Sequence, residues 1–170
     1  MTSNWEPSFH LMLQSEGGYA NHPQDPGGMT NLGVTKRVWE EWVGRESSEK
    51  EMRSLTPSMV APLYKRKFWD ACKCDLLPIG IDYLVFDFAV NAGVGRSAKL
   101  LQQCVGVSAD GAIGPITITA VKSKDPLELI EKFSQAKVDF YRSLSTFETF
   151  GRGWLNRVEA VKIKASSMLA

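Results

Sequence analysis

Three side chains near the amino terminus have the types and spacing that acid–base chemistry needs. They are Glu16, Asp25, which follows after eight intervening residues, and Thr30, five positions further on. A glycosidic bond is commonly cleaved by two carboxyl groups, one that protonates the leaving oxygen and one that meets the oxocarbenium-like carbon directly or through water. We therefore take all three as candidate catalytic residues. Their simpler interpretations include an Asx turn at Asp25 and an ordinary loop hydroxyl at Thr30.

Glu16 is the most informative of the three because of its place on a predicted helix. Phe9, Met12 and Leu13 precede it at helical spacing, and Gly17-Gly18 follows as a stop signal. This spacing places the carboxylate on the apolar stripe, in the last turn of the helix. Burial and the negative end of the helix dipole should both raise its pKa above that of a free glutamate, as a general acid requires. The alternative is a side chain that turns out to solvent.

Three further residues are candidate contacts for a sugar. Tyr19 offers a ring that could stack on a sugar face, and the amides of Asn31 and Asn91 could bind acetamido groups and hydroxyls. Their structural alternatives are a core position for Tyr19, a turn for Asn31 and a helix end for Asn91. Asp87 lies one helical turn before Asn91 on an apolar segment, and a buried aspartate must find a partner. We favour a structural role for Asp87.

Apolar periodicity predicts a mostly helical chain. After the first helix, residues 18–34 are dense in turn formers, and a small hairpin or loop is expected there. Residues 45–54 are interpreted as a charged, exposed connector. Further helices are expected at 35–43, 56–71, 81–92 and 97–105, after Gly114-Pro115, from 125 to 144, and after Gly151-Arg152-Gly153, with Arg157 of the last helix facing mostly outward. The fold class is therefore mainly α, with α+β left open.

Composition limits the functions that this chain can have. Its 170 residues suit one compact unit, and 20 basic against 19 acidic residues give no overall charge that would attract nucleic acid. The three cysteines and two histidines lack the spacing of a zinc site, so we expect no metal and no cofactor. No stretch resembles a membrane span or a cleaved signal peptide. We expect a monomer that is synthesised in the cytoplasm.

Longer motifs surround the candidate residues and resemble a known family. The segment Glu16-Gly17-Gly18-Tyr19 and the stretch from Asp25 to Thr35, Asp-Pro-Gly-Gly-x-Thr-Asn-x-Gly-Val-Thr, are similar to the amino-terminal signature of the glycoside hydrolase family 108 lysozymes. These are N-acetylmuramidases of phage endolysins and bacterial secretion-activator proteins. Residues 82–121 resemble the predicted peptidoglycan-binding region that accompanies the family; they include the run from Phe86 to Gly93 and Asp110-Gly111-x-Ile113-Gly114.

The resemblance implies a fold, a reaction and a substrate. It implies a lysozyme-like helical fold with a catalytic region at 1–81 and a peptidoglycan-binding-like helical region at 82–170, packed as one unit. It also implies cleavage of the β-1,4 bond between N-acetylmuramic acid and N-acetylglucosamine, with Glu16 matching the essential glutamate. Asp25 and Thr30 follow in the order seen in phage lysozymes of the T4 type, although the last gap is one residue shorter here.

Two other functions stay open at this stage. The chain could be a non-catalytic peptidoglycan-binding module, or a lytic transglycosylase that acts on the same bond without water. Because the glycan strands lie outside the cytoplasmic membrane, an enzyme without a signal peptide needs help with export. Release through holin pores, as for a phage endolysin, and a bacterial secretion system both fit this requirement.

Overall fold

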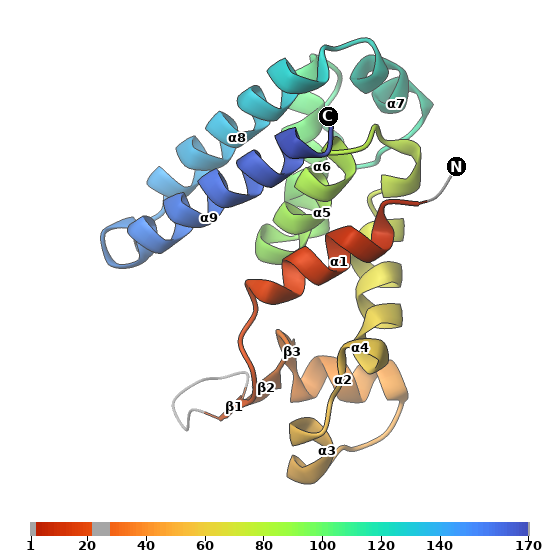
Figure 1. The fold of residues 1–170 in the computed structure, drawn as a ribbon, viewed down its shortest axis with the longest axis vertical. Helices are drawn as coiled ribbons and strands as arrows, with labels where there is room; N and C mark the ends of the chain where they lie inside the picture. The colour runs from red at the N-terminus through yellow and green to blue at the C-terminus, as the bar shows by residue number, and fades with distance from the viewer. Residues whose placement is uncertain (1–2, 22–27, 170) are drawn as a thin grey trace. The chain divides into compact units, whose positions relative to one another are not determined.

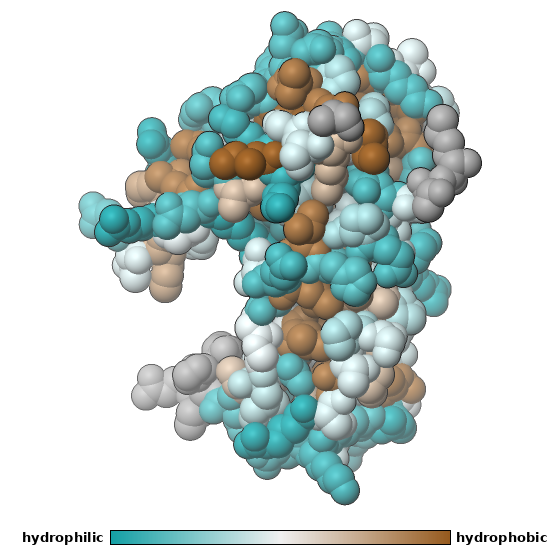
Figure 2. Space-filling model, in the orientation of Figure 1, coloured by the Kyte–Doolittle hydropathy of each residue, from teal (hydrophilic) through white to brown (hydrophobic). Residues whose placement is uncertain are grey.

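The structure is a computed structural model that describes residues 3–21 and 28–169. The described residues form mainly α-helices with one small antiparallel sheet (Figure 1), which confirms the predicted fold class. The chain divides into two compact units, one formed by Glu6–Lys67 and the other by Met1–Trp5 with Phe68–Ala170. On the face drawn in Figure 2, hydrophilic residues predominate and hydrophobic ones are scattered among them.

The Glu6–Lys67 unit contains the sheet and the shorter helices. Strands β1, β2 and β3 pair in that order, so the hairpin expected between residues 18 and 34 is confirmed, with Ala20 opposite Thr30 and Asn31 opposite Val34. Its elements are α1 (Trp5–Gln14, from Glu6 onward), β1 (Ala20–Asn21), β2 (Met29–Asn31), β3 (Val34–Thr35), α2 (Lys36–Val43), α3 (Glu49–Arg53) and α4 (Pro57–Tyr64).

Local capping explains where two of these helices begin. The Thr35 side chain accepts a hydrogen bond of 3.1 Å from the Val38 N–H, and Gly44 ends α2 in the left-handed conformation with φ 77°. Thr56 caps α4 in the same way, with Pro57 in the first turn, where its missing N–H has no cost. These starts and the α2 end were predicted, and the structure confirms them.

Two predictions for this unit were wrong. α1 ends at Gln14, so Glu16 lies beyond the helix rather than in its last turn. Residues 45–54 are not simply an exposed connector, because Glu49–Arg53 form α3 and Met52 is fully buried. A single apolar residue among charged ones gives no periodic signal, which is why sequence patterning missed this helix.

The second unit is built around a buried helix. α5 is buried along most of its length, as its nearly continuous apolar sequence predicted, and α8 and α9 lie side by side (Figure 1). After a π-helical segment, η1 (Lys65–Asp70), the elements are η2 (Cys74–Leu76), α5 (Ile81–Ala92), α6 (Val94–Val105), α7 (Pro115–Lys122), α8 (Pro126–Arg142) and α9 (Phe147–Ser167).

Glycines misled the prediction of two helices in this unit. α6 begins at Val94, directly after Gly93, three residues before its expected start at Ser97. α9 begins at Phe147 and continues through Gly151 and Gly153, whereas it was expected to start after them. At Gly151 the reason is packing, because a Cβ there would collide with the Phe147 ring.

Gln102 organises the loop between α6 and α7. Its buried amide donates to Asp110 Oδ1 at 2.9 Å, Ala112 O at 3.0 Å and Thr117 Oγ1 at 3.2 Å, and its oxygen accepts from the Gly111 N–H at 2.9 Å. One side chain thus provides hydrogen bonds to backbone groups of a loop that has no regular secondary structure.

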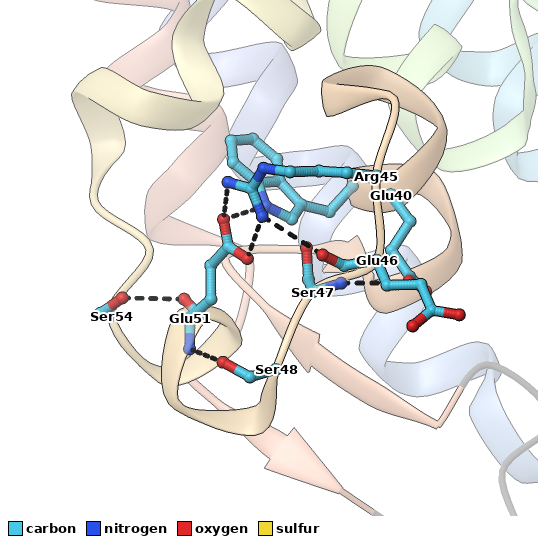
Figure 3. A network of polar contacts seen from close by, with 8 residues as sticks. Glu40, Arg45, Glu46, Ser47, Ser48, Glu51 and Ser54 are labelled. Atoms are coloured by element: carbon cyan, nitrogen blue, oxygen red, sulfur yellow. Dashed lines mark hydrogen bonds and ion pairs between the residues drawn. The ribbon is translucent and has the colours of Figure 1, made fainter.

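An ion pair closes the loop between α2 and α3 (Figure 3). Arg45 donates to both oxygens of Glu51, at 2.6 and 2.8 Å, and the Glu51 N–H donates to Ser48 at the start of α3. The buried Ser47 adds a second tie, because its N–H donates to a carboxylate oxygen of Glu40 on α2 at 3.1 Å. The hydrogen bonds from Arg45 lower the pKa of Glu51 to about 2.

Replacing Gln102 should weaken the helical unit. In Gln102→Ala the Gly111 N–H loses its acceptor while remaining partly buried, so the free energy of unfolding should fall by about 2 kcal/mol. Urea unfolding followed by circular dichroism measures the loss. Gln103→Ala is the matched control, since this neighbour on α6 is exposed and its change should stay within about 0.5 kcal/mol. Equal stability of the two variants would contradict the role of Gln102.

The Arg45–Glu51 pair should make stability depend on pH. The pKa of Glu51 is lower in the folded protein than its ordinary value of 4.5, so the stabilisation is complete above pH 4.5 and is lost as the pH falls toward 2. The difference in unfolding free energy between the wild type and Glu51→Gln should therefore shrink over this range. Glu46→Gln, at an exposed position beside Arg45, should follow the wild type. A constant difference for Glu51→Gln across the range would refute the pairing.

Candidate active site

Glu16 lies in a bend just after α1. The chain continues the helix by a tighter turn, in which the Ser15 N–H donates to Met12 O and the Glu16 N–H to Leu13 O, both at 3.0 Å. Glu16 is half-buried. The residue predicted to be catalytic therefore follows the carboxyl end of the helix directly and is held by backbone hydrogen bonds.

The turn between β2 and β3 requires an unusual backbone. Leu32 and Gly33 are its two central residues and both have positive φ, 54° and 78°, as in the type I′ turns that match the twist of a hairpin. Glycine adopts this conformation without strain, whereas leucine does so at a cost of about 1 kcal/mol or more. The surrounding contacts must therefore hold Leu32 in place.

Two functional groups converge on Gly33. A Cβ placed on this residue would stand 3.0 Å from Cδ and Oε2 of Glu16 and 2.5 Å from the hydroxyl oxygen of Tyr64. The carboxyl group and the phenol thus both lie against the backbone of the same turn. Only glycine leaves room for them, so this position determines where the Glu16 carboxyl can lie.

Hydrogen bonds fix the turn on both sides. The Leu32 N–H donates to Gly17 O at 3.1 Å, which joins the turn to the residue after Glu16. The Tyr64 hydroxyl donates to Leu32 O at 2.8 Å, and its buried ring packs on Phe9 of α1 with the centroids 5.9 Å apart. The sequence analysis did not select Tyr64, because no local signal indicates a partner 32 positions away in the sequence.

Thr30 and Asn31 occupy adjacent positions of β2 and therefore point to opposite faces of the sheet. Thr30 is half-buried, opposite Ala20 and Thr35. Asn31 is buried, and its amide donates to Met52 O at 2.9 Å and Arg53 O at 3.4 Å. The amide of Asn31 thus binds carbonyl groups at the end of α3 and ties that helix to the sheet.

Tyr19 lies just before β1 and contacts α3. The Arg53 guanidinium stands over its ring, 4.1 Å from the centroid, and its hydroxyl is 3.5 Å from Glu49 Oε1. Arg53 is itself paired with Glu49 at 2.9 Å. One face of the ring is therefore covered by a cation, a contact that the sequence did not predict.

The remaining candidates lie outside the part of the Glu6–Lys67 unit that the structure describes. Asp25 lies outside the described residues. Asn91 is exposed near the end of α5 and belongs to the other unit, as does Asp87. The buried Asp87 accepts a hydrogen bond of 2.9 Å from Arg157 of α9, so the outward orientation expected for Arg157 was wrong. A salt bridge across 70 positions of sequence leaves no local pattern.

The described residues contain no group of three histidine, cysteine, aspartate or glutamate side chains that could hold a metal ion. Among the described helices, none combines the length and the apolar character that crossing a membrane requires.

Comparisons with known proteins identify the family of this chain. The family model described as "Glycosyl hydrolase 108" matches residues 9–93 of this chain. The model described as "Predicted Peptidoglycan domain" matches residues 96–159. The solved structure of Brucella abortus SagA is similar to this chain, with 36% identity, a TM-score of 0.86, and coverage of 96% of this chain and 94% of that one. A comparison of this chain with curated proteins found no match. The chain belongs to the glycosyl hydrolase 108 family and, with its peptidoglycan domain, is a glycosidase that acts on peptidoglycan.

Proposed function

We propose that the protein hydrolyses the β-1,4 bond between N-acetylmuramic acid and N-acetylglucosamine, with Glu16 as the general acid. In this proposal the Glu6–Lys67 unit carries the catalytic residues and the helical unit binds the glycan. The reaction takes place at the cell wall, either in lysis, as by a phage endolysin, or in remodelling of the wall for secretion.

The position of the Glu16 carboxyl is the observation that supports this proposal most. It is half-buried, follows the carboxyl end of α1 and lies against the Gly33 backbone in a strained two-residue turn. A general acid must keep a fixed position relative to the leaving oxygen, and a bonded turn provides such support better than a free loop. Protonation of the glycosidic oxygen would then generate the oxocarbenium-like carbon.

Other residues complete the proposed site. Asp25 provides the second carboxylate, which stabilises the developing cation or orients the water, and Thr30 assists it through its hydroxyl. Tyr19 directly precedes β1, with Arg53 over one face of its ring, and contacts the sugar. Asn31 acts by positioning, because its amide holds the end of α3.

Removing the acid should abolish catalysis while preserving the fold. Glu16→Gln keeps the shape of the side chain but cannot donate the proton, so release of reducing ends from purified peptidoglycan should fall at least about a hundredfold. Thermal unfolding checks that the variant is folded. Glu6→Gln is the matched control, since Glu6 is an exposed glutamate on α1 and its replacement should leave the rate unchanged.

The products distinguish this reaction from its alternatives. Mass spectrometry should find reducing N-acetylmuramic acid ends, whereas a lytic transglycosylase would leave an anhydro sugar. A wild-type protein that binds peptidoglycan without releasing products would be a binding module. Full activity of folded Glu16→Gln would refute the assignment of Glu16.

Adding one methyl group at the turn should displace the acid. In Gly33→Ala the new Cβ meets Tyr64 and the Glu16 carboxyl, so the rate on purified peptidoglycan should fall about tenfold or more. Gly28→Ala is the matched control, because Gly28 also has positive φ, 65°, but its Cβ would meet no atom of the described residues within 4 Å. Both variants should lose about 1–2 kcal/mol of stability from the backbone conformation. Equal activity in the two would show that the turn does not position Glu16.

A further inference from the structure

A pocket in the helical unit is a candidate binding site that the acid–base chemistry does not use. It has a volume of about 310 Å³ and lies where the end of α5, the start of α6, the end of α8 and the middle of α9 meet. Its lining includes Asn91, Arg96, Tyr141, Trp154 and Arg157, but no aspartate or glutamate among the described residues. The volume is near the lower limit for small-molecule sites and suits a single sugar unit.

The charge of this region favours an anion. Asp87, which is 1% exposed, fixes the Arg157 guanidinium through its 2.9 Å hydrogen bond, and Arg157 is one of the two arginines that line the pocket. Lys137 of α8 is also buried. Burial, which dominates, together with the charge of Arg157, lowers the pKa of Lys137 to about 8, while Asp87 opposes that shift. One buried carboxylate therefore faces two cations, and Arg96 adds a third positive charge at the pocket.

The other side chains of the pocket suit a sugar ring. Tyr141 and Trp154 stack with centroids 5.1 Å apart and an interplanar angle of 27°, and both rings contribute aromatic surface to the lining of the pocket. Such surfaces pack against the apolar faces of sugars. Asn91 also lines the pocket, and an asparagine amide can bind an acetamido group. Arg96 lies over Phe140, 4.5 Å from the ring centroid, which orients its guanidinium.

We propose that this pocket binds one carboxylate-bearing acetamido sugar unit of peptidoglycan. Arg96 and Arg157 bind the carboxylate, while Tyr141, Trp154 and Asn91 bind the sugar. Arginine matches the geometry of a carboxylate and can bind both of its oxygens. The carboxylate belongs either to the lactyl group of N-acetylmuramic acid or to the peptide attached to it. This inference rests on the proposed function in one respect only, namely that peptidoglycan is the ligand.

Three small probes separate the sources of the carboxylate. N-acetylmuramic acid carries it on the lactyl group, N-acetylmuramyl-L-alanyl-D-isoglutamine carries it on the peptide, and N-acetylglucosamine has none. Each is titrated into the ¹⁵N-labelled full chain, and the indole N–H signal of Trp154 reports binding. At least one carboxylated probe should bind about tenfold more tightly than N-acetylglucosamine. Equal affinity for all three, or no saturable shift with either carboxylated probe, would overturn the proposal.

A charge variant tests the proposed contacts. Arg96→Gln removes an exposed guanidinium of the pocket and should weaken binding of the carboxylated probe at least about fivefold, with little effect on N-acetylglucosamine. Arg142→Gln removes the same charge at an exposed position of α8 that does not line the pocket, and its effect should be less than twofold. Arg157 is a poorer choice, since its loss would remove the hydrogen-bonded partner of the buried Asp87 and could destabilise the fold. Equal effects of the two variants would contradict a specific contact.

The two proposals fail in different ways. If the protein hydrolyses peptidoglycan but the Trp154 signal shows no saturable binding, the proposed sugar pocket is refuted and the enzymatic proposal stands. If the protein binds the carboxylated probe but releases no products from peptidoglycan, the enzymatic proposal is refuted and the sugar pocket stands. The probes are single sugar units without a β-1,4 bond between sugars, so the titration does not depend on catalysis.

Discussion

The close approach of the Glu16 carboxyl to the Gly33 backbone is the constraint on which the proposed chemistry depends. A carboxyl group that follows a helix end could take many positions, but here the turn between β2 and β3 limits them. That turn has positive φ at both Leu32 and Gly33, and its backbone is bonded to Gly17 on one side and to Tyr64 on the other. The small sheet therefore serves the site by presenting a rigid, side-chain-free surface to the carboxyl.

Most helix starts could be predicted from the sequence because their causes are local. The Thr35, Thr56 and Asp125 side chains each accept a hydrogen bond from an N–H three residues ahead, and such a cap needs no partner from elsewhere in the fold. Glycine gave weaker guidance. It ends α2 at Gly44, yet Gly151 lies inside α9, where contact with the Phe147 ring and not backbone freedom explains it. Glycine thus ends one helix and lies inside another, and the packing that distinguishes the two cases cannot be predicted from the neighbouring sequence.

The site was predictable in its residue types but not in its supports. Glu16 and the hairpin after it could be identified from spacing and motif. Tyr64 could not be identified, because its hydroxyl donates to the Leu32 carbonyl, 32 positions earlier in the sequence. Arg53 could not be placed over Tyr19 either, because it belongs to α3, a helix that the sequence analysis did not predict. Asn31 has a partner that the sequence did not predict, because its amide donates to the Met52 carbonyl at the end of α3. Polar side chains near a motif are often used by the fold itself, and only the three-dimensional partners decide between the two roles.

The two units differ in the charges that surround the groups proposed to act on the glycan. In the first unit the Glu16 carboxyl and the Tyr64 phenol both lie against the Gly33 backbone, and neither the phenol nor the backbone adds a formal charge. In the helical unit, the buried Asp87 stands against Arg157 and Lys137, so positive charges outnumber negative ones among these three residues. A peptidoglycan strand has both a neutral bridging oxygen and carboxylates. In our two proposals, the first environment acts on the bridging oxygen and the second binds a carboxylate.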